Sequence, residues 1–334
     1  MSRATGTARS SPGARMLVAF GLVLTVGCAE AGAWGCDGHR AVVFIAERVL
    51  SPAILAAVKA TLVAAPIDPA LRRFCDAVPD DPIADSSTWA DDYRNIDATT
   101  VGWHFIDVPL GVTLTASNRH ALCPSRDCII EAIAAQFRAL TTSADVAAKG
   151  KALRFLLHLI GDLHQPLHTT SNGDRGGNCV PVTYYDRAPQ ESPSGDLSPN
   201  LHSVWDTSTI RTLMTARGLA DARALAGYIV AAHPLPAAIA AQTPTLAVTT
   251  RWAQQSHAFA ETIVYPRLPT RVPREPASAA ILGSCADNHD VGHRMLAKHE
   301  VIDAHYERAS TPVIIDQLRL AGLRLAAVLK AAFP

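Results

Sequence analysis

The chain has 334 residues, of which 49% are hydrophobic, 18% charged and 6% aromatic. This composition excludes a disordered protein, because the apolar content is high and 30 basic residues balance 30 acidic ones. The same balance leaves no basic field to attract nucleic acid or an anionic membrane. A protein of this composition that handled phosphates would therefore need another source of positive charge.

The N-terminus has the pattern of an export signal. Residues 1–15 contain three arginines and no acidic residue, an apolar run follows over 16–28, and Ala31-Gly32-Ala33 offers small residues for cleavage. The apolar run is shorter than the roughly 20 residues that span a bilayer. We therefore expect residues 1–33 to be a cleaved signal peptide and residues 34–334 to form one periplasmic or secreted domain. An uncleaved anchor and a lipoprotein modified at Cys28 are the alternatives.

Helical periodicity dominates the rest of the chain. In chain order, the apolar spacing predicts helices over residues 39–50, from 51 onward, and over 129–140, 144–163, 219–232 and 301–333. Only residues 180–185 resemble a strand, which we interpret as half of a hairpin. The polar stretches 186–200 and 268–300 are typical of loops. The pattern predicts a mainly α fold, a single helical domain with long loops and a small β-hairpin.

Six cysteines follow the signal segment, and an even number in an exported chain indicates disulfides. They are Cys36, Cys75, Cys123, Cys128, Cys179 and Cys285. The short spacing between Cys123 and Cys128 favours a local bridge. The other four cysteines allow three pairings, and the sequence does not choose among them.

The densest group of metal-binding residue types lies in the sequence FLLHLIGDLHQPLH, residues 155–168. His158 and Asp162 are four residues apart, so they share one helix face and can hold one metal ion. Pro166 cannot continue that helix, which lets His168 point elsewhere. A single buried histidine is usually a core residue, but burying this whole group without partners would cost several kcal/mol. We therefore interpret the group as metal ligands.

Four other segments combine the same residue types. They are Trp34 to His39, Asp91 to Arg94, His104 with Asp107, and His202 with Asp206. Together they offer carboxylate and imidazole ligands and no obvious cysteine ligand, which favours catalytic over structural zinc. Their number implies more than one ion.

These motifs resemble those of the trinuclear-zinc nucleases of the nuclease S-one and P-one type, which share a superfamily with zinc phospholipase C. The matching segments span the mature chain and are Trp34 to His39, Ser87 to Asp91, His104 to Asp107, His158 to His168, Gly176 to Asn178 and Asn200 to Asp206. The resemblance implies the helical fold of the phospholipase C and P-one nuclease superfamily, and an enzyme that uses three zinc ions.

The resemblance also implies which residues hold the three ions. The first zinc is expected on Asp91, His104, His158 and Asp162. The second is expected on the α-amine and carbonyl of Trp34, on His39, and on Asp162 as a bridge. The third is expected on His168, His202 and Asp206.

Four further roles follow from the resemblance: Phe105 under a nucleobase, Arg94 on the phosphate, Asp107 beside the attacking water, and Asn178 at the substrate. The implied reaction is hydrolysis of single-stranded RNA and DNA to 5′-phosphate products by a zinc-activated water, together with 3′-nucleotidase activity. Stacking on Phe105 requires an unpaired base, although ordinary core packing is the alternative for this side chain. The expected partners are single-stranded nucleic acid and 3′-nucleotides, with no membrane, no obligate protein partner and a monomeric chain.

Two alternative functions stay open. A zinc phospholipase C would share much of the ligand set, but the five-residue step from Trp34 to His39 and the aspartate at 206 favour the nuclease. A metal-binding or nucleic-acid-binding protein without catalysis is disfavoured, because every implied ligand position holds a competent residue, as do Arg94 and Asp107.

Other features of the chain stay undecided. His164 is interpreted either as a residue behind the ligands or as a surface residue. Residues 186–199 and 272–300, the latter with His289, His293 and His299, either shape the substrate cleft or are solvated loops. The long-range disulfide of the fungal members has no clear counterpart, and among the open pairings we favour Cys36–Cys75 with Cys179–Cys285.

Overall fold

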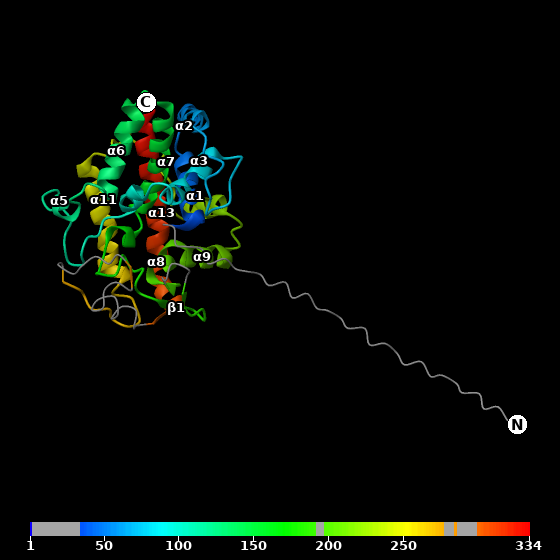
Figure 1. The fold of residues 1–334 in the computed structure, drawn as a ribbon, viewed down its shortest axis with the longest axis vertical. Coiled ribbons are helices and arrows are strands. Elements are labelled where there is room, and N and C mark those ends of the chain that lie inside the picture. Colours follow the sequence, from blue (N-terminus) through cyan, green and yellow to red (C-terminus); the bar gives the residue numbers. More distant parts are fainter. Residues whose placement is uncertain (2–33, 192–196, 277–283, 286–298) are drawn as a thin grey trace.

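The computed structural model of the protein describes residues 1, 34–191, 197–276, 284–285 and 299–334. Helices dominate the described residues, and the long helix α13 runs along the molecule beside α7 and α1 (Figure 1). The helices are α1 (Gly35–Glu47), α2 (Pro52–Ala64), α3 (Pro82–Ser86), α4 (Trp89–Tyr93), α5 (Arg119–Leu122), α6 (Ile129–Thr142), α7 (Val146–Asp162), α8 (Leu201–Ser203), α9 (Thr209–Arg217), α10 (Ala222–Ala232), α11 (Leu246–Phe259) and α13 (Ala304–Ala332). The mainly α fold predicted from the sequence is confirmed.

Within the described residues, four shorter helical turns join these helices, two of them 3-10 turns and two of them π-helical. They are η1 (Ala98–His104), η2 (Pro166–Thr169), η3 (Val204–Ser208) and η4 (Ala260–Val264). Three of them carry or adjoin predicted ligands, so the local departures from α-helix fall near the candidate site.

The helix α7 is the centre of the fold. Every residue from Ala152 to Asp162 is buried, and α1, α2, α4, α6 and α13 all pack against the helix. A helix that is apolar on all sides is expected to be surrounded in this way. The one arginine in this stretch, Arg154, donates to the carbonyl oxygens of Leu62 and Ala65 at the end of α2. Its guanidinium therefore donates hydrogen bonds to carbonyl oxygens that have no partner within the helix at its C-terminal end.

Capping residues set the starts of the predicted helices. Ser51 accepts a hydrogen bond from the backbone of Ile54, directly before Pro52 begins α2, as the sequence indicated. Asp145 and Asp221 cap α7 and α10 in the same way. The apolar spacing did not predict α9 or α11. Thr245 caps the start of α11, whereas α9 begins without a side-chain cap.

The strands are few and short. They are β1 (Val182–Tyr184), β2 (Gln190–Glu191), β3 (Leu197–Ser198) and β4 (Glu300–Ile302). β1 confirms the strand expected over 180–185, and at its end Tyr184 and Arg187 exchange backbone hydrogen bonds across a tight antiparallel turn, as in a hairpin. Over its full length, β1 has a partner that the sequence did not indicate. It pairs in parallel with β4, more than a hundred residues later in the chain, while β2 pairs with β3 in an antiparallel arrangement.

Three disulfides join the six cysteines, and all three follow the favoured pairing. They are Cys36–Cys75, Cys123–Cys128 and Cys179–Cys285. The first ties the start of α1 to the loop before α3, and the third closes a separation of 106 residues. Disulfides of this kind fit an oxidising compartment. In the described part of the chain, no helix combines the length and the apolar character that a bilayer span requires.

Candidate metal centre

The C-terminal end of α7 is the centre of the site. His158 and Asp162 lie one turn apart, are both fully buried, and approach each other to 3.2 Å between His158 Nε2 and Asp162 Oδ2. The helix ends at Asp162, and Pro166 then begins the turn η2 that carries His168. The helix break expected between Asp162 and His168 is therefore confirmed.

Two short elements bring a second carboxylate and a second imidazole to the same point. Asp91 lies in α4, and His104 is the last residue of η1. His104 Nδ1 lies 2.9 Å from Asp162 Oδ2, and His158 Nε2 lies 3.6 Å from Asp91 Oδ1. The four side chains expected on the first zinc thus converge on one buried point.

His39 approaches the other oxygen of Asp162. His39 Nε2 lies 3.2 Å from Asp162 Oδ1, whereas His104 and His158 face Oδ2. Asp162 therefore presents one oxygen to His39 and the other to His104 and His158, as a carboxylate that bridges two metal ions would. This approach requires a glycine at position 161, because a Cβ there would lie 2.8 Å from the Nδ1 atom of His39.

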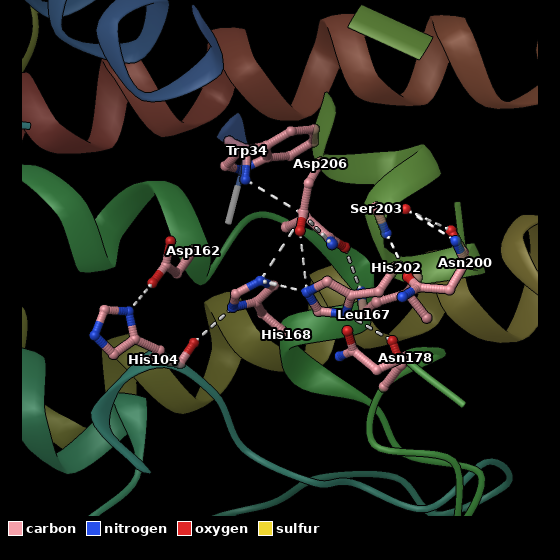
Figure 2. A network of polar contacts seen from close by, with 12 residues as sticks. Trp34, His104, Asp162, Leu167, His168, Asn178, Asn200, His202, Ser203 and Asp206 are labelled. Carbon is pink, nitrogen blue, oxygen red and sulfur yellow. Dashed lines mark hydrogen bonds and ion pairs between the residues drawn. The ribbon is translucent and has the colours of Figure 1, made fainter. Parts of the chain in front are cut away.

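Trp34 joins two of the ligand groups. Its indole nitrogen donates to the carbonyl oxygen of Gly161 at 2.7 Å, next to Asp162. Its backbone nitrogen donates to Asp206 Oδ1 at 3.3 Å (Figure 2). In the full chain this nitrogen is an amide, which donates a hydrogen bond and has no free lone pair for a metal. Coordination by the α-amine of Trp34, together with His39 and Asp162, applies to a processed chain and stays a prediction.

The third group is formed by His168, His202 and Asp206, which converge in Figure 2. Asn200 begins α8 by accepting from the backbone of Ser203, and this cap places His202 in the first turn. His202 Nε2 lies 3.1 Å from Asp206 Oδ2. It also lies 3.0 Å from His168 Nε2.

Hydrogen bonds at the other ring nitrogens fix the protons of these histidines. The Nδ1 atoms of His158, His168 and His202 contact the carbonyl oxygens of Ser87, His104 and Gly176 at 2.7–2.8 Å. A carbonyl oxygen only accepts, so each Nδ1 must carry a proton. In the neutral ring, Nε2 then presents a lone pair to the site, which is the state required of a metal ligand.

The lone pairs and carboxylates of the site therefore face one another. Several of the buried atoms have no hydrogen-bond partner among the described residues: His39 Nε2, Asp91 Oδ1, His104 Nε2, His158 Nε2, Asp162 Oδ1 and Asp206 Oδ2. Two imidazole lone pairs 3.0 Å apart, or a lone pair beside a carboxylate, repel each other unless a proton or a metal cation lies between them. The donor set of carboxylates and imidazoles, without thiolate, fits divalent zinc.

The pKa values of Asp162 and His158 also indicate that the buried carboxylates favour a positive charge beside them. Burial acts to raise the pKa of Asp162, but the field of His158 and hydrogen bonds from three histidines outweigh it and hold this pKa well below its usual range. Burial acts to lower the pKa of His158, but Asp162 and Asp91 outweigh it and raise that pKa. Burial lowers the pKa of His168 to about 4. A proton on His158 can thus balance the carboxylates, and a divalent cation would replace it.

Arg94 and Asp107 lie beside these groups. Arg94 Nη1 lies 3.6 Å from Asp91 Oδ1, and its side chain is 30% exposed, so its guanidinium lies at the rim of the first group. Asp107 is half-buried. Burial and the charge of Asp174 raise the pKa of Asp107 to about 7.

Phe105 and Asn178 are both half-buried. Phe105 adjoins His104, and its carbonyl oxygen accepts from the backbone of Ile129, which fixes the segment to the start of α6. Among the described residues, Phe105 is not part of the hydrophobic core cluster, which argues against ordinary core packing. Asn178 donates from its side chain to the carbonyl of Arg175 at 2.8 Å, so its amide also supports the loop it belongs to.

The glycines before Asn178 shape the loop that holds His202. Gly176 has a φ of 59°, and its carbonyl accepts from the ring of His202. A Cβ at this position would lie 2.4 Å from the carbonyl oxygen of Leu167. The Gly-Gly-Asn motif therefore supports a predicted ligand through its backbone.

His164 does not contact the ligand groups through its side chain. It is fully buried, its Nδ1 donates to the carbonyl of Ile160 at 2.6 Å, and its Nε2 accepts from Arg324 at 2.7 Å. The interpretation as a surface residue is wrong, and no described contact joins its ring to a predicted ligand. Burial and the charge of Arg324 lower its pKa to about 3.

Two residues near the site carried no role in the sequence analysis. His257, on α11, is fully buried and contacts the Thr170 hydroxyl at 2.8 Å, so it supports the segment after His168. Gln165 contacts Asp206. His257 has no predicted ligand near it in sequence, and so no pattern singled it out. His289 and His293 lie outside the described residues, and His299 is exposed.

The comparisons with known proteins agree with the geometry. The family described as S1/P1 nuclease matches residues 34–334. Nuclease S1 of Aspergillus oryzae is 31% identical over 182 residues, covering 52% of this chain and 54% of that protein, about half of its length. Endonuclease 2 of Arabidopsis thaliana is 27% identical over 312 residues, covering 90% of each chain. Nuclease P1 of Penicillium citrinum is 28% identical over 246 residues, covering 70% of this chain and 82% of that protein.

The family match covers every residue from Trp34 to the C-terminus, including all the predicted ligands. It confirms the resemblance carried by the sequence motifs. The chain belongs to the S1/P1 nuclease family.

Proposed function

We propose that residues 34–334 form an exported, zinc-dependent nuclease that hydrolyses single-stranded RNA and DNA to 5′-phosphate products and removes phosphate from 3′-nucleotides. The observation that carries the proposal is the third group, where His168 Nε2 and His202 Nε2 lie 3.0 Å apart beside the buried carboxylate of Asp206. A proton on His202 can balance this arrangement, and a divalent cation would satisfy both rings and the carboxylate at once. The nuclease names of the relatives support a phosphodiester as the substrate.

In this proposal three zinc ions are held by nine residues. They are Trp34, His39, Asp91, His104, His158, Asp162, His168, His202 and Asp206. When bound, the ions supply Lewis-acid chemistry, which makes water a better nucleophile near neutral pH and offsets negative charge on the phosphate. They would also provide the positive charge that the balanced composition lacks.

Arg94 and Asp107 act on the phosphate and on the attacking water. Arg94 lies at the partly exposed rim, where its fork of N–H donors can hold two phosphate oxygens. Its partner Asp91 keeps the guanidinium turned toward the ligand group. Asp107 accepts a hydrogen bond from the attacking water and so orients it toward phosphorus.

Phe105 and Asn178 recognise the nucleoside. The partly exposed side chain of Phe105 offers a flat surface on which a base can stack, and a base in a duplex is not free to do so. Preference for single strands follows from this requirement. Asn178 contributes amide hydrogen bonds at the substrate, from a loop whose backbone also supports His202.

Residues 1–33 act as a signal peptide in this proposal, and cleavage after Ala33 creates the mature N-terminus at Trp34. The domain then folds in an oxidising compartment, periplasmic or extracellular, as the three disulfides require. The mature chain acts as a monomer, without a membrane segment or an obligate protein partner.

The test compares several substrates with one zinc-loaded preparation. We expect turnover of denatured DNA, of RNA and of a 3′-nucleotide, with duplex DNA cut much more slowly. The His202→Ala variant should lose this activity, whereas the matched variant His233→Ala, at an exposed histidine, should keep it.

Two other outcomes would replace the proposal. Rapid cleavage of phosphatidylcholine with inert denatured DNA would make the chain a phospholipase C. Zinc binding without turnover of any of these substrates would make it a binding protein without catalysis.

A further inference from the structure

Gln165 lies between two predicted ligands, in the turn that joins α7 to η2. It is fully buried. Its backbone N–H donates to the carbonyl of Asp162 at 2.9 Å, and its own carbonyl accepts from the N–H of His168 at 3.0 Å. The main chain of Gln165 thus contacts Asp162, the expected bridging ligand, and His168 of the third group.

The orientation of the Gln165 side chain is fixed by its neighbours. Its Oε1 accepts from the backbone N–H of Leu167 at 2.5 Å. A flipped amide would point its NH₂ group at this N–H donor, so only one orientation is allowed. In that orientation Nε2 donates to Asp206 Oδ1 at 2.7 Å.

This hydrogen bond gives the two oxygens of Asp206 different environments. Oδ1 receives the amide of Gln165 and, at 3.3 Å, the backbone N–H of Trp34. Oδ2 has no hydrogen-bond partner among the described residues and faces His202 Nε2 at 3.1 Å. The carboxylate therefore directs Oδ2 to the point where the third ion is expected.

We propose that Gln165 is a positioning residue for the third metal ion, because it holds Asp206 so that one defined oxygen is available as a ligand. The inference rests on the proposed function, since it assumes an ion on His168, His202 and Asp206. Outer partners of this kind fix the orientation of a ligand, and losing one typically weakens metal binding about 10–100-fold.

The expected effect is selective for one ion. The backbone contacts of Gln165 to Asp162 and His168 persist in any side-chain variant. The side chain loses its bond to Asp206 and its bond from the backbone N–H of Leu167, which precedes His168. Both bonds lie at the third group, so the affinity for the third ion should fall while the other ions stay bound.

The structure offers a closely matched control in Gln317. This glutamine is also buried, and its amide donates at 2.7 Å to the carbonyl of His164, the residue directly before Gln165. No described contact joins its side chain to a predicted ligand. Gln317 lies in α13, so Gln317→Met removes a buried amide that contacts the same turn and leaves the bond from Gln165 to Asp206 in place.

The test measures zinc affinity with the mature chain starting at Trp34. Wild type, Gln165→Met, Gln317→Met and His202→Ala are equilibrated with zinc at buffered free concentrations, and zinc per chain is measured by elemental analysis. Gln165→Asn serves as a second variant, because it keeps a buried amide but shortens its reach by one methylene. The zinc-induced rise in Tm of each variant is a second readout that does not depend on activity.

We expect Gln165→Met and Gln165→Asn to release one ion at about 10–100-fold higher free zinc than wild type. Gln317→Met should follow the wild-type curve. The inference is overturned if His202→Ala loses one ion while both Gln165 variants bind all ions as wild type does. It is also overturned if Gln317→Met weakens zinc binding as much as Gln165→Met does. If His202→Ala binds as many ions as wild type, the third metal site itself is wrong, and the proposed function fails with it.

Discussion

The backbone nitrogen of Trp34 donates to Asp206 Oδ1 at 3.3 Å, while its indole donates to the carbonyl beside Asp162. One residue at the expected cleavage site therefore contacts both Gly161, next to the expected bridging ligand Asp162, and Asp206 of the third group. As an amide it can only donate a hydrogen bond. As a free α-amine, with an ordinary pKa of about 7.7–8.0, it could lose a proton and bind a metal.

Extending the chain before Trp34 should therefore weaken the second zinc. We expect protein carrying one added glycine before Trp34 to lose or weaken that ion and most of its activity on denatured DNA, because the amine is then an amide. Zinc content and turnover of the two proteins provide the measurement. Equal values would show that the free terminus is not a ligand.

Asp162 should be the most sensitive ligand. Its two oxygens face different histidines, His39 on one side and His104 with His158 on the other. We expect Asp162→Ala to lose two zinc ions, whereas Asp91→Ala, which removes a ligand of one ion, should lose one. Elemental analysis of the two variants separates these outcomes. An Asp162→Ala protein with wild-type metal content would contradict the bridge.

Phe105 should contribute to substrate binding rather than to folding. Stacking of a base on an aromatic ring contributes about 1–3 kcal/mol, so Phe105→Ala should lower kcat/KM on denatured DNA about 5- to 150-fold. Phe105→Tyr, which keeps the ring, should remain close to wild type. Thermal unfolding should change little in either variant, because the side chain lies outside the core cluster of the described residues. A large loss of Tm in Phe105→Ala with unchanged kinetics would assign the ring to packing.

His164 should make the folded protein sensitive to acid. The folded state keeps this histidine neutral, with a pKa of about 3, whereas its ordinary value is 6.5. Below pH 6.5 the unfolded chain therefore binds more protons, and the stability that neutral His164 contributes is fully present above that pH and lost as the pH falls toward 3. The added slope is at most about 1.4 kcal/mol per pH unit.

Urea unfolding at several values between pH 7 and pH 4 measures this slope. The ligand histidines titrate in wild type and in His164→Gln alike, so the difference between the two curves isolates His164. We expect the free energy of unfolding of wild type to fall more steeply with acid than that of the variant. Parallel curves would show that His164 is not kept neutral.

The sequence predicted best where a physical rule acts locally. Spacing of four residues placed His158 with Asp162 and His202 with Asp206, and Pro166 marked the end of α7. The partner of β1 was not predictable, because β4 follows more than a hundred residues later and parallel pairing leaves no turn signal.

The hydrogen bonds that hold the predicted ligands could not be predicted from the sequence either. Ser87 and Gly176 fix histidine rings through backbone carbonyls, which every residue possesses. His164 resembled a member of the ligand cluster by its position, but the helix end turns its ring toward Arg324. Only the three-dimensional structure distinguishes such a residue from a ligand.

The number of zinc ions per mature chain tests the account most directly. Elemental analysis of protein starting at Trp34, dialysed against excess zinc and then against buffer, should give about three ions per chain, one for each buried ligand group. A strong chelator should remove them together with the activity on denatured DNA, and zinc should restore both. A single ion per chain, or full activity after the chelator has removed all zinc, would contradict the trinuclear centre.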